Sequence, residues 1–453
     1  MTVFDEIAEV NGDNEWKEWL RKVLDLKIEI ANFVASRCRR GQAREIVGYL
    51  KGSFNLGLHV RFDAGPDAVI RFPKPGHTAF RDEKVANEVQ FMQYLSENTT
   101  IPVPRVIDWG QTEESPHHLG PFIIMDYVHG RRLSTVLKQP TQSQEEDVIL
   151  NPNIDNTMLD KVYGQIASFM LQLYQLDFPL IGSISRDPVL KTWSVTGRPL
   201  TYNMNELATV SFYPTEKFPT TPFTSAREYF QNLADEHITH LQTQRNLAKD
   251  PEDAWKRYVA RHRFKKLIPK YCTDDAGPFK PFCDDLQPSN MLIDEKTLEI
   301  TAVLDFEFTN VTPAQFTCDP PWWLLLLGPD MWLERYTMAE FLARYKPRME
   351  QFLQALEKVE GGSGFGGKQQ LGRPRLSALM RDSWATGRFW FDYAARKSFD
   401  IDTVYWTALH EQDPAGTELL NDEEVREAMK PFTEKKMKQL TAYKKECTAL
   451  FSI

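Results

Sequence analysis

The sequence predicts an α+β protein of two lobes, a small β-rich lobe with one helix followed by a larger, mostly helical lobe. Residues 45–50, 56–63 and 68–72 are apolar, β-branched runs that read as three consecutive strands. Apolar side chains then recur at helical intervals over residues 80–96 and, further along the chain, over residues 157–177. A chain of 453 residues also exceeds what one hydrophobic core usually supports, so two or more lobes are expected.

The division of the chain rests on these patterns together with the lobe organisation of a family that the sequence resembles. We expect residues 1–40 to form an N-terminal helical extension, residues 41–128 the small lobe and residues 129–453 the large lobe. Two further strand-like runs, 106–111 and 122–125, complete the small lobe after its helix.

Residues 185–280 read as an irregular segment apart from helical patches at 225–247 and 251–267. His237 and His240 are spaced for one face of the first of these helices. Because no third ligand is near them in the sequence, we expect both to be surface residues and not a metal site.

Three polar side chains stand at an informative spacing in the second half of the chain. Asp285 and Asn290 are five residues apart, and Asp305 comes twenty residues after Asp285. The apolar runs 291–294 and 300–304 flank a charged turn and predict a β-hairpin. Such a hairpin would bring Asp305 back beside Asn290.

This stretch resembles the aminoglycoside phosphotransferase family, a branch of the protein-kinase-like superfamily that phosphorylates small molecules. The pattern is D-L-x-x-x-N followed by D-F-x, and the family's own loop usually reads H-G-D-L-H-P-G-N with I-D-x-E after it. The positions in register are Asp285, Leu286, Pro288, Asn290, Asp305 and Glu307.

The resemblance implies a bilobal protein-kinase-like fold and a specific division of labour. Asp285 would be the catalytic base for an acceptor hydroxyl, and Asn290 and Asp305 would hold Mg²⁺ on the phosphates of ATP or GTP. The partner would be a small molecule with a hydroxyl acceptor. Two positions depart from the family pattern, because Cys283 and Gln287 stand where histidines are usual.

The same resemblance implies a nucleotide site in residues 41–128. A glycine-containing turn would close over phosphates, a cation on the third strand would pair with them, and an acid on the next helix would hold that cation. Each feature also has a purely structural interpretation. The glycine-containing turn could be an ordinary hairpin turn, the cation a surface charge at a strand edge, and the acid part of a solvated helix face. The predicted site, with the lobe-connecting hinge included, consists of Gly52, Ser53, Asn55, Gly57, Arg71, Glu88, Asp126 and Val128.

Two further motifs resemble a fungal branch of the family, C-D-D at residues 283–285 and P-P-W-W-L-L-L-L at residues 320–327. We expect the tryptophans of the second motif to pack in the core of the large lobe. Arg388, Trp390 and Asp392 lie in another aromatic helical stretch. They could line an acceptor pocket, but core packing is the favoured interpretation.

Composition is that of an ordinary globular protein, with 42% hydrophobic and 26% charged residues. The formal charge of −9 and the lack of a basic stripe disfavour nucleic-acid binding. Five widely spaced cysteines without a C-x-x-C motif favour a reducing compartment. The acidic N-terminus lacks a secretory or transit pattern, and the apolar run 322–327 is far too short for a membrane span. We therefore expect a soluble, cytoplasmic protein without a membrane span.

Two alternatives remain open. Residues 362–369 nearly spell a Walker A loop, but Gln369 cannot replace the metal-binding Ser or Thr, so a flexible glycine-serine loop is predicted. Cys283, Gln287 and Arg71 are substitutions at supporting positions of the kinase pattern. They favour, as the rival function, a pseudokinase or nucleotide-binding scaffold protein without turnover.

Overall fold

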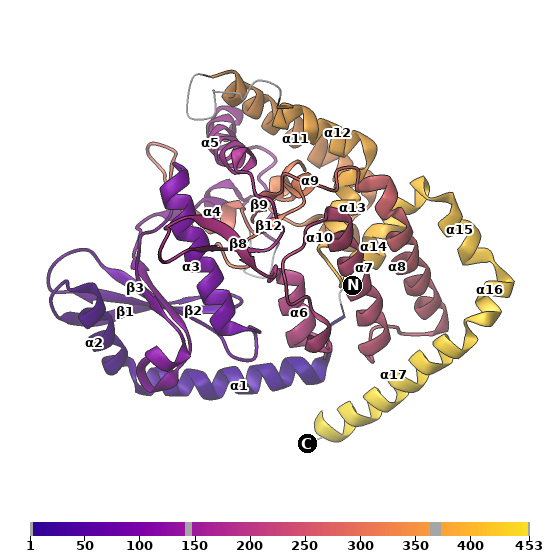
Figure 1. The fold of residues 1–453 in the computed structure, drawn as a ribbon, viewed down its shortest axis with the longest axis horizontal. Coiled ribbons are helices and arrows are strands. Elements are labelled where there is room, and N and C mark those ends of the chain that lie inside the picture. The colour runs from indigo at the N-terminus through magenta and orange to yellow at the C-terminus, as the bar shows by residue number, and fades with distance from the viewer. Residues whose placement is uncertain (1–2, 141–146, 363–372, 452–453) are drawn as a thin grey trace.

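The computed structural model describes residues 3–140, 147–362 and 373–451. Figure 1 shows a small lobe built on one antiparallel sheet and a larger helical lobe beside it. The small lobe's sheet has the order β1-β2-β3-β5-β4. Its strands are β1 (Ala43–Lys51), β2 (Asn55–Phe62), β3 (Ala68–Pro73), β4 (Val106–Gly110) and β5 (Phe122–Asp126).

The two faces of this sheet are covered by different helices. Because side chains alternate along a strand, Ile70 packs in a core with Trp19 and Val34, from helices α1 (Glu6–Asp25) and α2 (Lys27–Cys38). Val69 faces the other way and packs in the core that includes α3 (Arg81–Asn98). The same alternation places Arg71 on the α3 side of the sheet, where the two lobes meet.

Helix α1 bridges the two lobes along one side of the molecule (Figure 1). Asp5 caps its start by accepting hydrogen bonds from the Ile7 and Ala8 amides, and the Asp5 amide itself donates to Val210 of the large lobe. Further along, the Trp19 indole donates to the Leu119 carbonyl of the small lobe at 2.5 Å. The helical segment expected at the N-terminus is therefore present, while the proposed division of the chain at residues 40 and 128 stays a prediction.

The large lobe contains two pairs of long helices and several short elements. Helix α5 (Asn156–Gln175) packs on α11 (Met338–Gly361), and α7 (Ala226–Thr243) packs on α8 (Pro251–Tyr271). The other helices are α4 (Leu133–Leu137), α6 (Tyr202–Val210), α9 (Ala314–Thr317), α10 (Pro329–Arg335), α12 (Leu376–Thr386), α13 (Arg388–Ala395), α14 (Ile401–Val404), α15 (Pro414–Asn421), α16 (Glu423–Ala428) and α17 (Lys430–Phe451). The short strands are β6 (Arg131–Arg132), β7 (Ser183–Arg186), β8 (Trp193–Gly197), β9 (Lys280–Phe282), β10 (Met291–Asp294), β11 (Glu299–Val303) and β12 (Asn310–Thr312).

Several expectations are met and one is corrected. The strands, the helices at 80–96, 157–177, 225–247 and 251–267, and the hairpin β10–β11 all occur close to their predicted bounds. The start of the segment expected to be irregular instead forms the hairpin β7–β8 and helix α6. None of the helices in the described ranges is long and apolar enough to cross a membrane. The glycine-serine loop predicted at 362–369 lies, from residue 363 on, outside the described residues.

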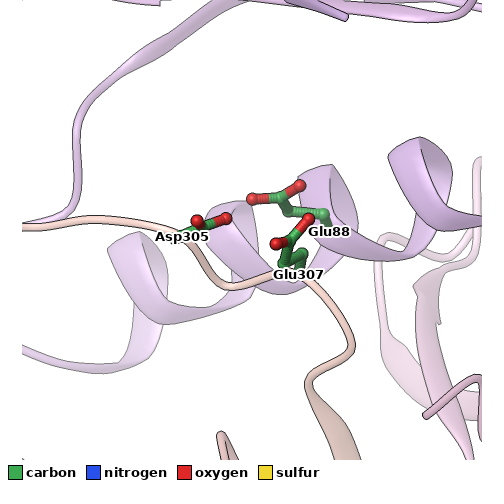
Figure 2. A group of neighbouring side chains, drawn as sticks. All are labelled: Glu88, Asp305 and Glu307. Carbon is green, nitrogen blue, oxygen red and sulfur yellow. The ribbon is translucent and has the colours of Figure 1, made fainter. Parts of the chain in front are cut away.

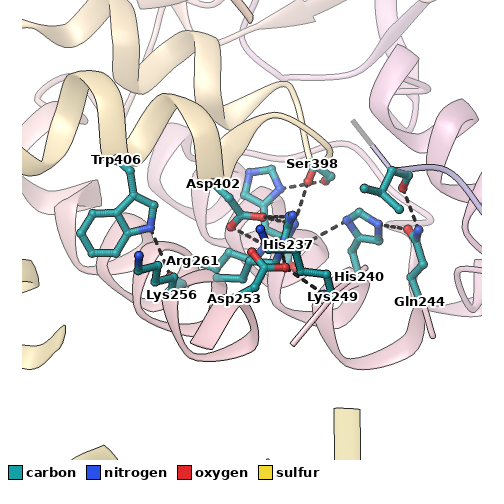
Figure 3. A network of polar contacts seen from close by, with 12 residues as sticks. His237, His240, Gln244, Lys249, Asp253, Lys256, Arg261, Ser398, Asp402 and Trp406 are labelled. Atoms are coloured by element: carbon teal, nitrogen blue, oxygen red, sulfur yellow. Dashed lines mark hydrogen bonds and ion pairs between the residues drawn. The ribbon is translucent and has the colours of Figure 1, made fainter. Parts of the chain in front are cut away.

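The expectation that His237 and His240 are surface residues is wrong. Both are completely buried, in the polar network shown in Figure 3. The buried Arg261 of α8 donates to both carboxylate oxygens of Asp402, at 3.0 and 2.9 Å. Arg261 also donates to the carbonyls of His237 and Ser398. A helical histidine spacing cannot reveal such burial, because the rings bond to Arg261 of α8 and to Ser398, which are distant in the sequence.

This burial predicts a pH dependence of stability. Burial lowers the pKa of His237 to about 3 from an ordinary value of 6.5, so the folded protein keeps the ring neutral. As pH falls below the unfolded value the unfolded chain takes up the proton first, which favours unfolding by about 1.4 kcal/mol for each pH unit. We expect the stability advantage of wild type over His237→Gln to shrink between neutral pH and a pH of about 4. Urea unfolding of both proteins across that range measures it, and a constant difference would contradict a neutral buried ring.

Candidate active site

A cavity of about 290 Å³ lies between the two lobes. Its walls come from β1 to β3, α3, the segment after β5, and the hairpin β10–β11. Seven of the eight residues expected to bind the nucleotide line it, and so do the two expected to bind metal. Ser53 is exposed and does not line it. The residues brought together are Gly52, Asn55, Gly57, Arg71, Glu88, Asp126, Val128, Asn290 and Asp305.

One part of the cavity is apolar and offers a slot for a flat ring. Leu50 and Val69 of the sheet and Leu292 of the hairpin line it, next to Tyr127 and Val128. The Asp126 carboxylate is not free at this point, because Arg105 donates to it at 3.0 Å and Arg40 also pairs with it. Any role of Asp126 toward a ligand therefore falls to its backbone.

A charged cluster occupies the opposite part of the cavity. Arg71 pairs with the buried Glu88 of α3 and, at 3.1 Å, with Asp305. The Arg71–Glu88 pair is the one that the sequence predicts. Burial opposes the charge of Arg71, but Glu88 and Asp305 outweigh it and raise the pKa of the guanidinium further. Arginine in place of the usual lysine therefore keeps a permanent positive charge on β3.

Glu88, Asp305 and Glu307 each place a carboxylate oxygen within 4.8 Å of the others (Figure 2). Burial and the neighbouring Glu307 raise the pKa of Asp305 well above its usual range. Asp305 also has a left-handed backbone, with φ of +65°, a conformation that aspartate adopts more readily than most non-glycine residues. Carboxylate oxygens with the Asn290 amide nearby are the hard donors that Mg²⁺ prefers, so these residues fit that ion.

The hairpin brings Asp305 close to Asn290, as the sequence predicts. Strands β10 and β11 pair antiparallel, and the Leu304 amide donates to the Asn290 carbonyl at 2.7 Å. Asn290 in turn donates its side-chain amide to the Asp285 carboxylate at 2.6 Å. Asp285, Asn290 and Asp305 therefore form one continuous chain of neighbours, of which Asn290 and Asp305 line the cavity and Asp285 lies behind Asn290.

Asp285 is held by two side-chain amides. Gln287 donates to one carboxylate oxygen and Asn290 to the other. Burial raises the pKa of Asp285 in spite of these two donors. Gln287, which departs from the family pattern, therefore helps to fix the orientation of the Asp285 carboxylate.

Beyond Asp285 the wall of the site is aromatic and charged. Phe54, next to Gly52 at the turn between β1 and β2, contacts Tyr202 and Phe308 with ring centroids 5.5 and 5.9 Å apart. Lys397 lies over the Tyr202 ring at 4.5 Å, and Arg396 pairs with Asp284. No sequence pattern indicates these residues, since their spacing along the chain follows no motif.

The favoured core interpretation is confirmed for most of the aromatic stretches, whereas Trp322 and Arg388 are only partly buried. Trp323, Trp390 and Asp392 are buried, and Asp392 accepts a hydrogen bond from Gln315. Trp322 is partly exposed and donates its indole N–H to the Asp284 carbonyl at 3.0 Å, which supports the catalytic-loop backbone.

Lys84 is the functional candidate that sequence reasoning missed. It lies one helical turn before Glu88 and is almost completely buried. Its ammonium pairs with Glu307 and donates to the Asn55 side chain at 2.9 Å. A lysine four residues before the predicted Glu88, on the same helix face, was the available signal.

Comparisons with known proteins find a family match, distant relatives and solved structures of similar fold. Residues 45–193 match the phosphotransferase enzyme family, which leaves the loop at 283–305 outside the matched range. Clavilactone A biosynthesis cluster protein Y of Ampulloclitocybe clavipes is 26% identical over 60% of this chain and 62% of its own. Altered inheritance of mitochondria protein 9 of Clavispora lusitaniae is 23% identical over 54% of this chain and 44% of its own. The chain thus spans less than two thirds of either relative. Among solved structures, a macrolide 2'-phosphotransferase type I superposes with a TM-score of 0.42 at 12% identity, covering 86% of this chain and 93% of the other.

Proposed function

We propose, on the premise that this chain is a member of the phosphotransferase enzyme family through residues 45–193, that it transfers the terminal phosphoryl group of ATP or GTP to a hydroxyl of a small molecule. The observation that carries the proposal is the chain of contacts from Asp285 through Asn290 to the loop that bears Asp305. It joins a partly buried carboxylate to a side-chain amide and an acidic cluster that line a cavity suited to a nucleotide.

The donor nucleotide fits the two parts of the cavity. We assign the base to the apolar slot between Leu50, Val69 and Leu292, where the backbone of Asp126 and Val128 can meet its polar edge. The phosphates would then lie under the turn at Gly52 and against Arg71, which Glu88 holds in place.

Asp285 is assigned the role of general base. Its two donors, Gln287 and Asn290, fix the orientation of the carboxylate, and its raised pKa makes it a better acceptor for a hydroxyl proton. Asn290 and Asp305 would hold Mg²⁺. When bound, that ion supplies positive charge that neutralises the phosphate oxygens during transfer.

The rival function is a pseudokinase or nucleotide-binding scaffold without turnover. It rests on Cys283, Gln287 and Arg71, the three substitutions at supporting positions. In the structure Gln287 orients Asp285, and Arg71 makes the pair expected of a lysine. Two of the three substitutions therefore keep the supporting contacts, which favours the enzyme.

A cytoplasmic location belongs to the same proposal. All five cysteines lie in the described ranges as free thiols, which suits a compartment that keeps thiols reduced. Fluorescence imaging of the tagged full-length protein tests it, and a signal confined to a secretory compartment would exclude it.

Nucleotide binding provides the direct test of the site. We expect ATP with Mg²⁺ at a hundred times its dissociation constant to stabilise wild type by about 2.7 kcal/mol, because only the folded state binds it. Asp305→Ala should lose the Mg²⁺-dependent part of this gain, while Asp274→Ala, at an exposed acidic residue outside the cavity, should keep it. Thermal denaturation with ATP, with and without Mg²⁺, measures the difference. A well-folded wild type without any Mg²⁺-dependent rise would favour the scaffold.

A further inference from the structure

Two cations, Arg71 and Lys84, meet three carboxylates at residues 305–307, the segment that we call the metal loop. The carboxylates are those of Glu88, Asp305 and Glu307. Arg71 is shared between Glu88 and Asp305, so it leaves Glu307 to another partner. That partner is Lys84, which is 1% exposed. A buried ammonium is costly unless it is paired and hydrogen-bonded, so an unpaired Lys84 could not be tolerated here.

Lys84 and Asn55 contact the same carboxylate oxygen of Glu307. The Asn55 side chain donates to Glu307 Oε2 at 2.8 Å, and the Lys84 ammonium pairs with the same atom. Lys84 also donates to the carbonyl oxygen of the Asn55 side chain at 2.9 Å, which closes a triangle. Burial opposes the charge of Glu307, but Lys84 and Arg71 outweigh it and lower the pKa of that carboxyl.

The triangle connects α3, the metal loop and the start of β2, and the proposed reaction requires these three elements to keep fixed relative positions. Lys84 belongs to α3, Glu307 follows Asp305 by two residues on the metal loop, and Asn55 begins β2 directly after the turn at Gly52. The Gly52 amide donates to the Asn55 carbonyl at 3.0 Å, so a shift of Asn55 moves the turn. The phosphate-covering turn and the metal loop are therefore tied together through one buried lysine.

We propose that Lys84 is a positioning residue that acts through Glu307, fixing the metal loop and the phosphate-covering turn relative to each other, and does not itself bind the nucleotide. This inference rests on the proposed function. Two cations facing three carboxylates leave one net negative charge, which favours a divalent cation. Removing Lys84 and the Glu307 charge together preserves that balance.

A double-mutant cycle tests the proposal with ADP and Mg²⁺ as the probe. Lys84→Met leaves Glu307 without its cation, and Glu307→Gln leaves Lys84 with only the 4.0 Å ion pair to Glu88, so each should weaken binding of ADP with Mg²⁺ by about tenfold or more. The double variant Lys84→Met/Glu307→Gln should recover to within about threefold of wild type, since neither buried charge is then unpaired. Isothermal titration calorimetry on the full-length chain gives the affinities.

Three outcomes would overturn the inference. A double variant as weak as Lys84→Met would show that Lys84 contacts the nucleotide itself. A Lys84→Met protein that is less stable but binds ADP with Mg²⁺ like wild type would show that Lys84 contributes only to the stability of the fold. If Lys84→Met does not fold, Asn55→Ala keeps both charges and breaks the triangle, and unchanged affinity in that variant would also contradict it. Failure of wild type to bind ADP with Mg²⁺ would instead contradict the proposed function.

Discussion

Asp285→Asn is expected to abolish phosphoryl transfer while leaving nucleotide binding intact. The substitution keeps the size of the side chain but removes the carboxylate that would take the acceptor's proton. Loss of a positioned general base typically reduces kcat by about 10²–10⁴-fold. Because Asp285 does not line the nucleotide cavity, and Asn290 and Asp305 remain in place, the stabilisation by ATP with Mg²⁺ should persist.

The matched comparison is with Asp305→Ala, which should lose both the Mg²⁺-dependent stabilisation and turnover. Steady-state rates with any hydroxyl compound that wild type phosphorylates, together with melting curves, separate the two variants. The pH profile adds a check on the assignment. Since burial raises the pKa of Asp285, kcat/KM should fall as acid protonates that carboxylate. Wild-type turnover in Asp285→Asn would remove Asp285 from the mechanism.

Arg261→Met is expected to cost the largest part of the protein's stability, about 3–5 kcal/mol of the free energy of unfolding. The reason is the buried Asp402, which is then left with Arg257 alone. Arg261 also satisfies the carbonyls of His237 and Ser398, and these would lose their donor. Ser398 follows Lys397 and Arg396 directly, so the loop that holds Asp284 should loosen as well.

Arg426→Met is the control for this prediction. Its ion pair with Glu252 lies on the surface, with about half of each side chain exposed, and such pairs contribute about 0–1 kcal/mol. Urea unfolding at neutral pH gives both free energies. Equal losses in Arg261→Met and Arg426→Met would contradict the structural role of the network in Figure 3.

Local sequence patterns predicted the strands and helices, and two of these predictions also placed residues from different elements next to each other. The hairpin at 291–303 was predictable because two apolar runs flank a charged turn, and it carried Asp305 to Asn290. The Arg71–Glu88 pair was predictable because a strand and the following helix meet at a fixed place in the resembling fold.

Contacts between distant segments were not predictable from these patterns. Lys84 and Glu307 are far apart in the sequence, and helical periodicity shows that Lys84 shares a face with Glu88 but not that the face is buried. The spacing of His237 and His240 on α7 alone suggests a solvent-facing pair, but the two rings are buried and bond to Ser398 and Arg261, which lie in other parts of the sequence. Tyr202 and Lys397 likewise reach the site only through the packing of the large lobe.

The most direct measurement is a search for phosphoryl transfer itself. Wild type and Asp285→Asn are incubated with ATP, Mg²⁺ and a library of small molecules that carry hydroxyl groups, and mass spectrometry follows each compound. We predict that wild type adds the mass of one phosphoryl group to at least one compound, with matching ADP release, and that Asp285→Asn adds none. Mg²⁺-dependent ATP binding by wild type without transfer to any hydroxyl, water included, would contradict the enzyme and favour the scaffold.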